Sequence, residues 1–266
     1  QIRIMTQGYK CVICLAKSGS SQIAKNFRQQ GALHEYDFKT IAELAINRNI
    51  DRSELLKYMQ ERKKRLEGKI DVSTTLIHIC DKPMIEELNM RPIFLIREPL
   101  DWISSMIKYA IKTEDINELD LDGGWRKEYG KVFIKNEKIP FSGLKNIQPR
   151  TIKRLIKPLM RTWTEYTDKL YNLALHSKDG ISNVYPTDSL GKIETHTKIS
   201  KYYNLEDRPP MNFFLISNQT KDIYNIKKEI INQEPVLSKI KLKDEADIIS
   251  SINNMNLELN NEKQNG

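Results

Sequence analysis

The stretch that most constrains the fold runs from Tyr9 to Phe38. Its first part, Tyr9–Ala16, is a nearly continuous apolar run, which is typical of a strand buried on both faces of a parallel sheet. A short loop of small and polar residues follows, and Gln22–Gln30 then places apolar residues at helical spacing before Gly31. The order strand, tight loop, helix predicts an α/β fold: a single domain with a central, mainly parallel sheet flanked by helices.

The loop between this strand and helix has the composition of an anion-binding site. The first backbone N–H groups of a helix lack partners inside the helix and lie at the positive end of its dipole. Gly19 lets the backbone approach an anion closely, Lys17 adds a positive charge, and the hydroxyls of Ser18, Ser20 and Ser21 add donors. The loop differs from the usual nucleoside triphosphate loop, in which lysine follows the last glycine.

A second strand-to-helix junction lies between Arg91 and Tyr109. The apolar run Pro92–Ile96 predicts another buried strand, and a helix with Asp101 as its N-cap is expected to follow. Arg97 comes directly after the strand, and Ser105 falls eight residues later, in the first turn of that helix. The planar guanidinium of arginine suits phosphate oxygens, so this junction predicts a second anion site.

The two junctions, in this order, resemble those of sulfotransferases. In that family a Lys-Ser-Gly loop grips the 5′-phosphosulfate of the donor, 3′-phosphoadenylyl sulfate. An arginine and a serine from a later Arg-x-Pro-x-Asp segment hold its 3′-phosphate. Lys17 to Ser21 match the first motif, and Arg97, Pro99, Asp101 and Ser105 match the second. The resemblance implies a P-loop-NTPase-like sulfotransferase fold, adenosine 3′,5′-bisphosphate as the product, and no metal.

The remaining patterns place further elements along the chain. Residues 1–252 are expected to form the sulfotransferase-like domain, 113–148 an irregular acceptor-binding or lid segment, and 253–266 a disordered, asparagine-rich tail. The basic run Arg62–Arg65 is interpreted as solvated helix surface. The further predicted strands are Leu33–Phe38, Thr74–Cys80 and part of Ser182–Leu190, and the predicted helices are Thr40–Asn47, Asp51–Leu66, Met84–Asn89, Thr151–His176 and Lys192–Tyr203.

Sulfuryl transfer also needs a base that takes the proton of the acceptor. Glu35 lies eighteen residues after Lys17, at the position where some bacterial sulfotransferases place a catalytic glutamate. Asp81 lies roughly where cytosolic members place a catalytic histidine, and His34 is a third candidate. Glu35 is the favoured base, and Lys17 is expected to neutralise charge on the transferring group. For each carboxylate, helix capping or a surface ion pair is the structural alternative.

Composition narrows the class of partner. The 43 Lys and Arg against 35 Asp and Glu give a net charge of +8, which favours polyanionic ligands such as a bisphosphorylated donor. No apolar run is long enough to predict a membrane span. The three cysteines are an odd number, which indicates a reducing, cytoplasmic location, and Cys11 and Cys14 are interpreted as buried hydrophobic residues.

The expected function is therefore sulfuryl transfer to a hydroxyl or amine of a small-molecule or glycan acceptor, with no nucleic-acid partner. Two departures from the family stand out. The turn Pro186–Leu190 matches the family's Tyr-Glu-Asp-Leu fairly only at Asp188, and the late Arg-Lys-Gly loop has no counterpart. The alternatives are a kinase-like phosphate-binding enzyme, in which Asp81 would hold Mg²⁺, and a non-enzymatic basic module that binds polyanions.

Overall fold

A computed structural model describes residues 8–47, 50–112, 149–178, 180–205 and 221–265. Within these described residues, five parallel strands form one sheet in the order β2-β3-β1-β4-β5. The central strand pairs with both neighbours, so that Cys11 lies opposite Asp71 and Cys14 lies opposite Leu95. This confirms the predicted α/β fold with a parallel sheet. The strands are β1 Tyr9–Cys14, β2 Ala32–His34, β3 Ile70–Val72, β4 Met90–Ile96 and β5 Val184–Pro186.

The chain divides into two compact units, a division that the sequence did not indicate. Unit 1 comprises residues 1–96 and 170–215, and unit 2 comprises 97–169 and 216–266. Unit 1 contains the whole sheet, and unit 2 is helical in its described part. None of the described helices is both long enough and apolar enough to cross a membrane. The predicted acceptor segment, 113–148, lies outside the described residues.

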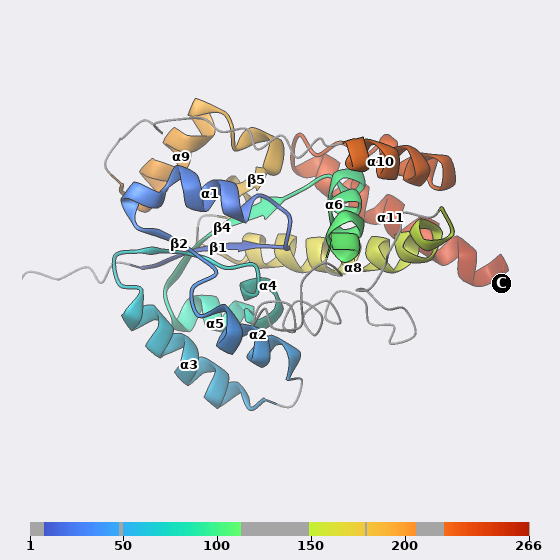
Figure 1. The fold of residues 1–266 in the computed structure, drawn as a ribbon. Coiled ribbons are helices and arrows are strands. Elements are labelled where there is room, and N and C mark those ends of the chain that lie inside the picture. Colours follow the sequence, from blue (N-terminus) through green and yellow to red (C-terminus); the bar gives the residue numbers. More distant parts are fainter. Residues whose placement is uncertain (1–7, 48–49, 113–148, 179, 206–220, 266) are drawn as a thin grey trace, which may run out of the picture. The chain divides into compact units, whose positions relative to one another are not determined.

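Helices cover both faces of the sheet in unit 1, because side chains alternate between the faces along each strand. On one face Val12 and Cys14 of β1 pack with residues of α1 and α9, including Tyr203. The other face is covered by α3, α4 and α5 (Figure 1). The helical elements of unit 1 are α1 Ser20–Asn26, η1 Arg28–Gln30, α2 Phe38–Ile46, α3 Arg52–Arg65, α4 Leu76–Ile79, α5 Lys82–Glu87, η2 Gly180–Asn183, η3 Thr187–Ser189 and α9 Ile193–Tyr203.

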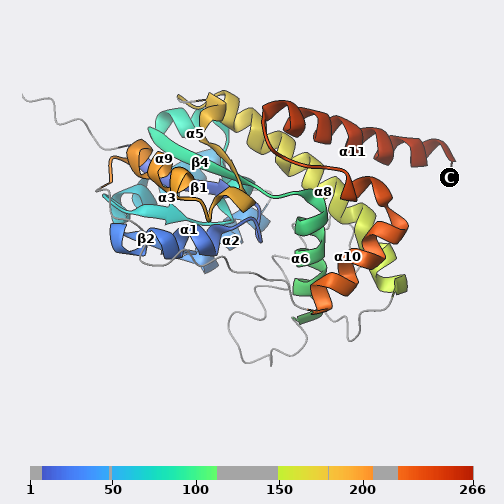
Figure 2. The same ribbon diagram turned by 90° about the horizontal axis from the view of Figure 1, so that it is seen from above.

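Unit 2 has its own apolar core, in which Trp102 and Trp163 are almost completely buried. Helix α6 lies beside α10 (Figure 2), where Lys227 pairs with Asp101. The described helical elements of unit 2 are α6 Pro99–Lys112, α8 Pro149–Leu175, α10 Lys221–Gln233, η4 Pro235–Ser238 and α11 Glu245–Asn265. The last residues of α8, from Leu170 on, belong to unit 1.

The predicted strand over Thr74–Cys80 is wrong. The strand of this region is β3, which ends at Val72, and residues Leu76–Ile79 form the short helix α4. The apolar, β-branched composition favours a strand locally, but Leu76 and Ile77 are buried as part of a helical turn. Tertiary burial overrides the local preference here.

The predicted disordered tail is also wrong, because α11 continues to Asn265. Three apolar residues at helical spacing, Ile252, Met255 and Leu259, are buried along it. The asparagine-rich composition between them concealed this stripe.

Two smaller predictions are corrected in the same way. Helix α6 begins at Pro99, so that Asp101 lies within its first turn and Ser105 lies in its second. Arg62, interpreted as solvated, is only 1% exposed and pairs with Asp71 of β3. Other predicted helices agree with the structure to within a few residues, including α3 with Asp51 at its N-cap.

Candidate functional site

The carboxyl end of β1 lies at the point where the order of strands reverses. The chain passes from β1 to β2 and β3 on one side and then crosses to β4 and β5 on the other. In open α/β sheets, ligands bind outside the carboxyl ends of the strands at such a topological switch point. The Lys17–Ser21 loop leaves β1 at this place.

This loop presents backbone donors at the start of α1. Gly19 is the N-cap, in the left-handed conformation with φ of 95°, and Lys17 also has a positive φ, 66°. The N–H groups of Gly19, Ser20 and Ser21 make no hydrogen bond within the described part of the chain. Successive N–H groups of this kind form a concave anion site, to which the exposed Lys17 adds charge.

Residues that follow β5 hold the loop in place. The Thr187 hydroxyl lies 3.0 Å from the Ser18 carbonyl oxygen and 2.9 Å from that of Ile96, so it can donate to either. A Cβ atom at Gly19 would lie 2.6 Å from Cδ1 of Leu190. A larger residue at this position would be strained by its φ, and the end of the Leu190 side chain would have to shift to admit it.

The end of β2 meets the start of α1. His34 Nε2 lies 3.2 Å from the Ser20 hydroxyl and 3.3 Å from the Ser21 hydroxyl. It also lies 3.9 Å from Oε1 of Glu35. The structure therefore brings together four of the predicted site residues, two from the loop and two candidate bases.

Glu35 is held at the carboxyl edge of the sheet by the residues that follow β3. Its Oε1 accepts hydrogen bonds from the Thr74 N–H at 3.1 Å and the Thr74 hydroxyl at 2.7 Å. Its Oε2 accepts one from the Ser73 hydroxyl at 3.1 Å, and its backbone N–H donates to the Val72 carbonyl at 2.9 Å. The side chain keeps 21% of its surface exposed, which leaves it accessible to a solute.

Asp81 caps a helix, which was the structural alternative to a catalytic role for this carboxylate. It is the N-cap of α5, where its Oδ1 accepts a hydrogen bond from the Met84 N–H at 2.8 Å. Its Oδ2 lies 3.6 Å from Nε of Arg52. These contacts account for the residue without a catalytic role.

Arg97 and Ser105 both belong to unit 2. The Arg97 carbonyl accepts a hydrogen bond from Nε1 of the buried Trp163 at 2.9 Å. Ser105 is 7% exposed, and its hydroxyl has no hydrogen-bond partner among the described residues. Buried hydroxyls normally have a partner, so this one is suited to a ligand. That Arg97 and Ser105 hold the same donor as the Lys17 loop remains a prediction.

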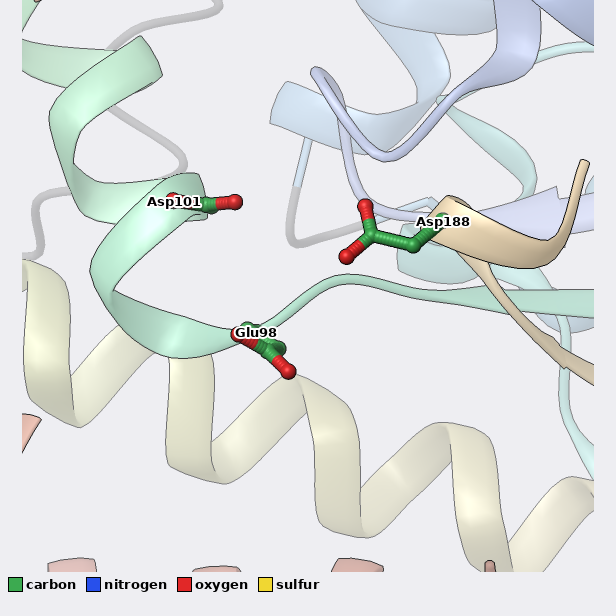
Figure 3. A group of neighbouring side chains, drawn as sticks. All are labelled: Glu98, Asp101 and Asp188. Atoms are coloured by element: carbon green, nitrogen blue, oxygen red, sulfur yellow. The ribbon is translucent and has the colours of Figure 1, made fainter. Parts of the chain in front are cut away.

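Figure 3 draws three acidic side chains, Glu98, Asp101 and Asp188. Two of them belong to unit 2 and already pair with lysines: Glu98 with Nζ of Lys241 at 2.8 Å, and Asp101 with Lys227. The third, Asp188, is an exposed residue of η3 in unit 1. The lysine partners neutralise the carboxylates of unit 2, which does not favour cation binding there.

The three cysteines are buried free thiols, as predicted for Cys11 and Cys14. Burial, and then the negative charge of Glu35, raises the pKa of Cys14 well above its ordinary value. The thiol therefore stays neutral and inert near neutral pH.

A groove of about 370 Å³ lies at the opposite edge of the sheet. Its lining includes Tyr9, at the start of β1, and Leu88, which precedes β4, together with Lys63 and Lys69. None of the predicted site residues lines it. The candidate site is therefore defined by side-chain and backbone groups at the carboxyl edge.

Sequence reasoning missed several groups that shape the site. Ser73 and Thr74 hold Glu35. Thr74 was included in the predicted strand and Ser73 stands directly before it, so neither gave a separate signal. Thr187 was passed over because the turn was compared with a family motif that it matches poorly. The pairing of Arg62 with Asp71 was concealed by the basic run in which the arginine lies.

Comparison with known proteins finds no match among family models, curated proteins or solved structures.

Proposed function

We propose that this protein is a sulfotransferase that moves a sulfuryl group from 3′-phosphoadenylyl sulfate to a hydroxyl or amine of a small-molecule or glycan acceptor. The observation that carries the proposal is the contact of His34 with the Ser20 and Ser21 hydroxyls at 3.2 and 3.3 Å. It joins a candidate anion loop to a candidate base at the switch point of the sheet.

The loop, Lys17 and Glu35 each have a role in this reaction. The loop N–H groups and Lys17 stabilise the charge of the transferring group and the leaving phosphate. The acceptor atom forms a bond to sulfur while the bond between sulfur and the phosphate oxygen breaks, and Glu35 takes the acceptor's proton. Adenosine 3′,5′-bisphosphate leaves with the electron pair of the broken bond.

The other end of the donor is assigned to Arg97 and Ser105. A guanidinium can bind phosphate oxygens in a bidentate manner. The Ser105 hydroxyl, which has no hydrogen-bond partner in the described part of the chain, can donate to one of them. This assignment makes the 3′-phosphate the feature that distinguishes the donor from other adenine nucleotides.

The nucleotide part of the proposal is tested by isothermal titration with adenosine 3′,5′-bisphosphate, its 2′,5′ isomer and adenosine 5′-monophosphate. We expect the 3′,5′-bisphosphate to bind at least about tenfold more tightly than the other two, since each charge-assisted hydrogen bond contributes on the order of 1.5–3 kcal/mol. Equal affinities that fall steeply with salt would instead favour the basic polyanion-binding module.

The base is tested with Glu35→Gln. We expect kcat for sulfuryl transfer to fall by about a hundredfold or more, because the amide cannot accept the proton. The affinity for adenosine 3′,5′-bisphosphate should change less than about twofold, since the loop donors remain.

Asp81→Asn is the matched control. Asparagine caps helices as well as aspartate does, so both stability and transfer should persist. If Asp81→Asn abolished transfer and Glu35→Gln did not, Asp81 would be the base and the proposed arrangement would be wrong.

A further inference from the structure

The segment that carries Glu35 has an unusual backbone. Glu35 and Asp37 both have φ of 51°, in the left-handed region, with Tyr36 between them. Residues other than glycine adopt this conformation only when their surroundings hold them there, and such positions cluster at functional sites. The surroundings of residues 35–37 therefore determine where the Glu35 carboxylate lies.

Helix α3 supplies contacts that hold this segment. The Tyr58 hydroxyl donates to Oδ2 of Asp37 at 3.1 Å, and Oδ1 of the same carboxylate accepts from the Thr40 hydroxyl at 2.7 Å. The guanidinium of Arg62 lies 5.4 Å from the centroid of the Tyr36 ring, a cation–π contact. Tyr36 and Asp37 therefore both contact side chains of α3.

These contacts are anchored to the sheet through Arg62. Its Nε and Nη2 donate to the two oxygens of Asp71 in β3, at 2.7 and 2.8 Å, and its Nη1 donates to the Tyr58 hydroxyl at 3.2 Å. Arg62 is 1% exposed and Asp71 is fully buried. A buried ion pair of this kind adds little net stability by itself. Here it joins α3 to β3 and places the Arg62 guanidinium against the Tyr58 hydroxyl.

The protonation state of Tyr58 suits this arrangement. Burial raises the pKa of its hydroxyl to about 12, so the group keeps its proton at neutral pH and can donate to Asp37. The charge of Arg62 opposes this shift and that of Asp37 adds to it. The Tyr58 hydroxyl accepts a hydrogen bond from Arg62 and donates one to Asp37. It therefore connects the ion pair of Arg62 and Asp71 to residues 35–37.

We propose that Tyr58 and Arg62 are positioning residues, which hold residues 35–37 so that the Glu35 carboxylate stays against Ser73 and Thr74, ready to meet the acceptor. The assignment of this purpose rests on the proposed function, because it takes Glu35 as the base. The physical part, that Tyr58 controls the placement of Glu35, does not depend on any activity.

The physical part is tested by hydrogen exchange in Tyr58→Phe. The variant removes only the hydroxyl, and Tyr203→Phe is a matched control, since Tyr203 donates to the Cys11 carbonyl at 2.6 Å on the other face of the sheet. We expect exchange of the Thr74 amide, which donates to Glu35, to speed up by about tenfold in Tyr58→Phe and not in Tyr203→Phe.

Asp37→Ala removes the other partner of the same hydrogen bond. It should accelerate exchange at least as much, since it also removes the contact with Thr40. The double variant with Tyr58→Phe should show little change beyond Asp37→Ala, because the contact between Tyr58 and Asp37 is already lost. Unchanged exchange at Thr74, equal acceleration in Tyr203→Phe, or additive effects in the double variant would each overturn the proposal.

Comparing kcat with nucleotide affinity then separates a positioning role from a general destabilisation of the site. Tyr58→Phe should lower kcat by about tenfold while the affinity for adenosine 3′,5′-bisphosphate changes less than about twofold. A parallel loss of nucleotide affinity would overturn the positioning role. If the parent protein neither bound this nucleotide nor transferred sulfate, the proposed function would fail, and the exchange experiment would still decide whether Tyr58 controls Glu35.

Discussion

At the scale of single residues, Gly19 carries the tightest constraint in the candidate anion loop. Its φ of 95° is unfavourable for any other residue, and an added Cβ would meet Leu190 at 2.6 Å. Gly68 also has a positive φ, 75°, but a Cβ there would meet nothing within 4 Å. The two glycines therefore separate the effect of backbone conformation from that of close packing.

We expect Gly19→Ala to destabilise the fold by about 2 kcal/mol or more, and Gly68→Ala by about 1 kcal/mol, since the left-handed region alone costs about 1–2 kcal/mol. Gly19→Ala should also weaken binding of adenosine 3′,5′-bisphosphate by at least about tenfold, because the loop donors lose their arrangement. Urea unfolding and calorimetric titration measure the two effects. Equal destabilisation by both substitutions would contradict the packing shown for Leu190.

The residue types of the loop could be assigned a purpose from the sequence, because an anion site needs small residues, donors and charge within a few positions. The contact partners of Glu35 could not be predicted. Thr74 lies 39 residues away in the chain, and it reaches Glu35 only because β2 and β3 are neighbours in the sheet.

At the scale of elements, α11 shows how composition can mislead. Leu259 is 7% exposed and Leu257, two residues earlier, is 61% exposed. In a disordered tail the two leucines would be equivalent, whereas in a packed helix they differ. This makes the same substitution at both positions a direct test of α11.

We expect Leu259→Ala to lower the free energy of unfolding by about 2 kcal/mol or more, which is the usual cost of truncating a buried leucine. Leu257→Ala should change it by less than about 0.5 kcal/mol, as surface substitutions do. Denaturant unfolding followed by circular dichroism gives both values. Two neutral substitutions would show that this part of α11 is not packed.

The segment from Ser73 to Cys80 shows the converse case, in which a strand-like composition becomes a helix. A strand over Thr74–Cys80 would have continued β3 past the neighbouring β2, which ends at His34. The chain instead leaves the sheet after Val72, and Ser73 and Thr74 donate hydrogen bonds to Glu35. The end of β3 is thus set by pairing across the sheet and not by local preference.

At the scale of the whole molecule, the core of the sheet contains groups that resist ionisation. Burial raises the pKa of the thiols of Cys11 and Cys14 above their ordinary value of 9.0. Burial likewise raises the pKa of Tyr9 and Tyr203 above 10.0. In the unfolded chain these groups ionise at their ordinary values, so above about pH 9 the folded state binds more protons than the unfolded state.

The stabilisation from these groups is therefore complete below pH 9 and is lost as the pH rises further. We expect the free energy of unfolding, measured in reducing buffer, to fall by about 1.4 kcal/mol per buried thiol for each pH unit above the ordinary thiol value. Cys14→Ala should be less stable at pH 7.5, yet lose less between pH 9 and pH 10. Parallel curves for the parent and the variant would show that Cys14 does not titrate with unfolding.

The sequence by itself determined the α/β class, the parallel sheet and the two strand-to-helix junctions, because these follow from the spacing of apolar residues and from the small residues of the loops. It also identified Glu35 and His34 as residues at a strand end. Only the tertiary structure decided that the His34 ring meets Ser20 and Ser21, that Asp81 caps a helix, and that Arg62 is buried against Asp71. These outcomes depend on which strands become neighbours, and that order is set by packing between segments far apart in the chain.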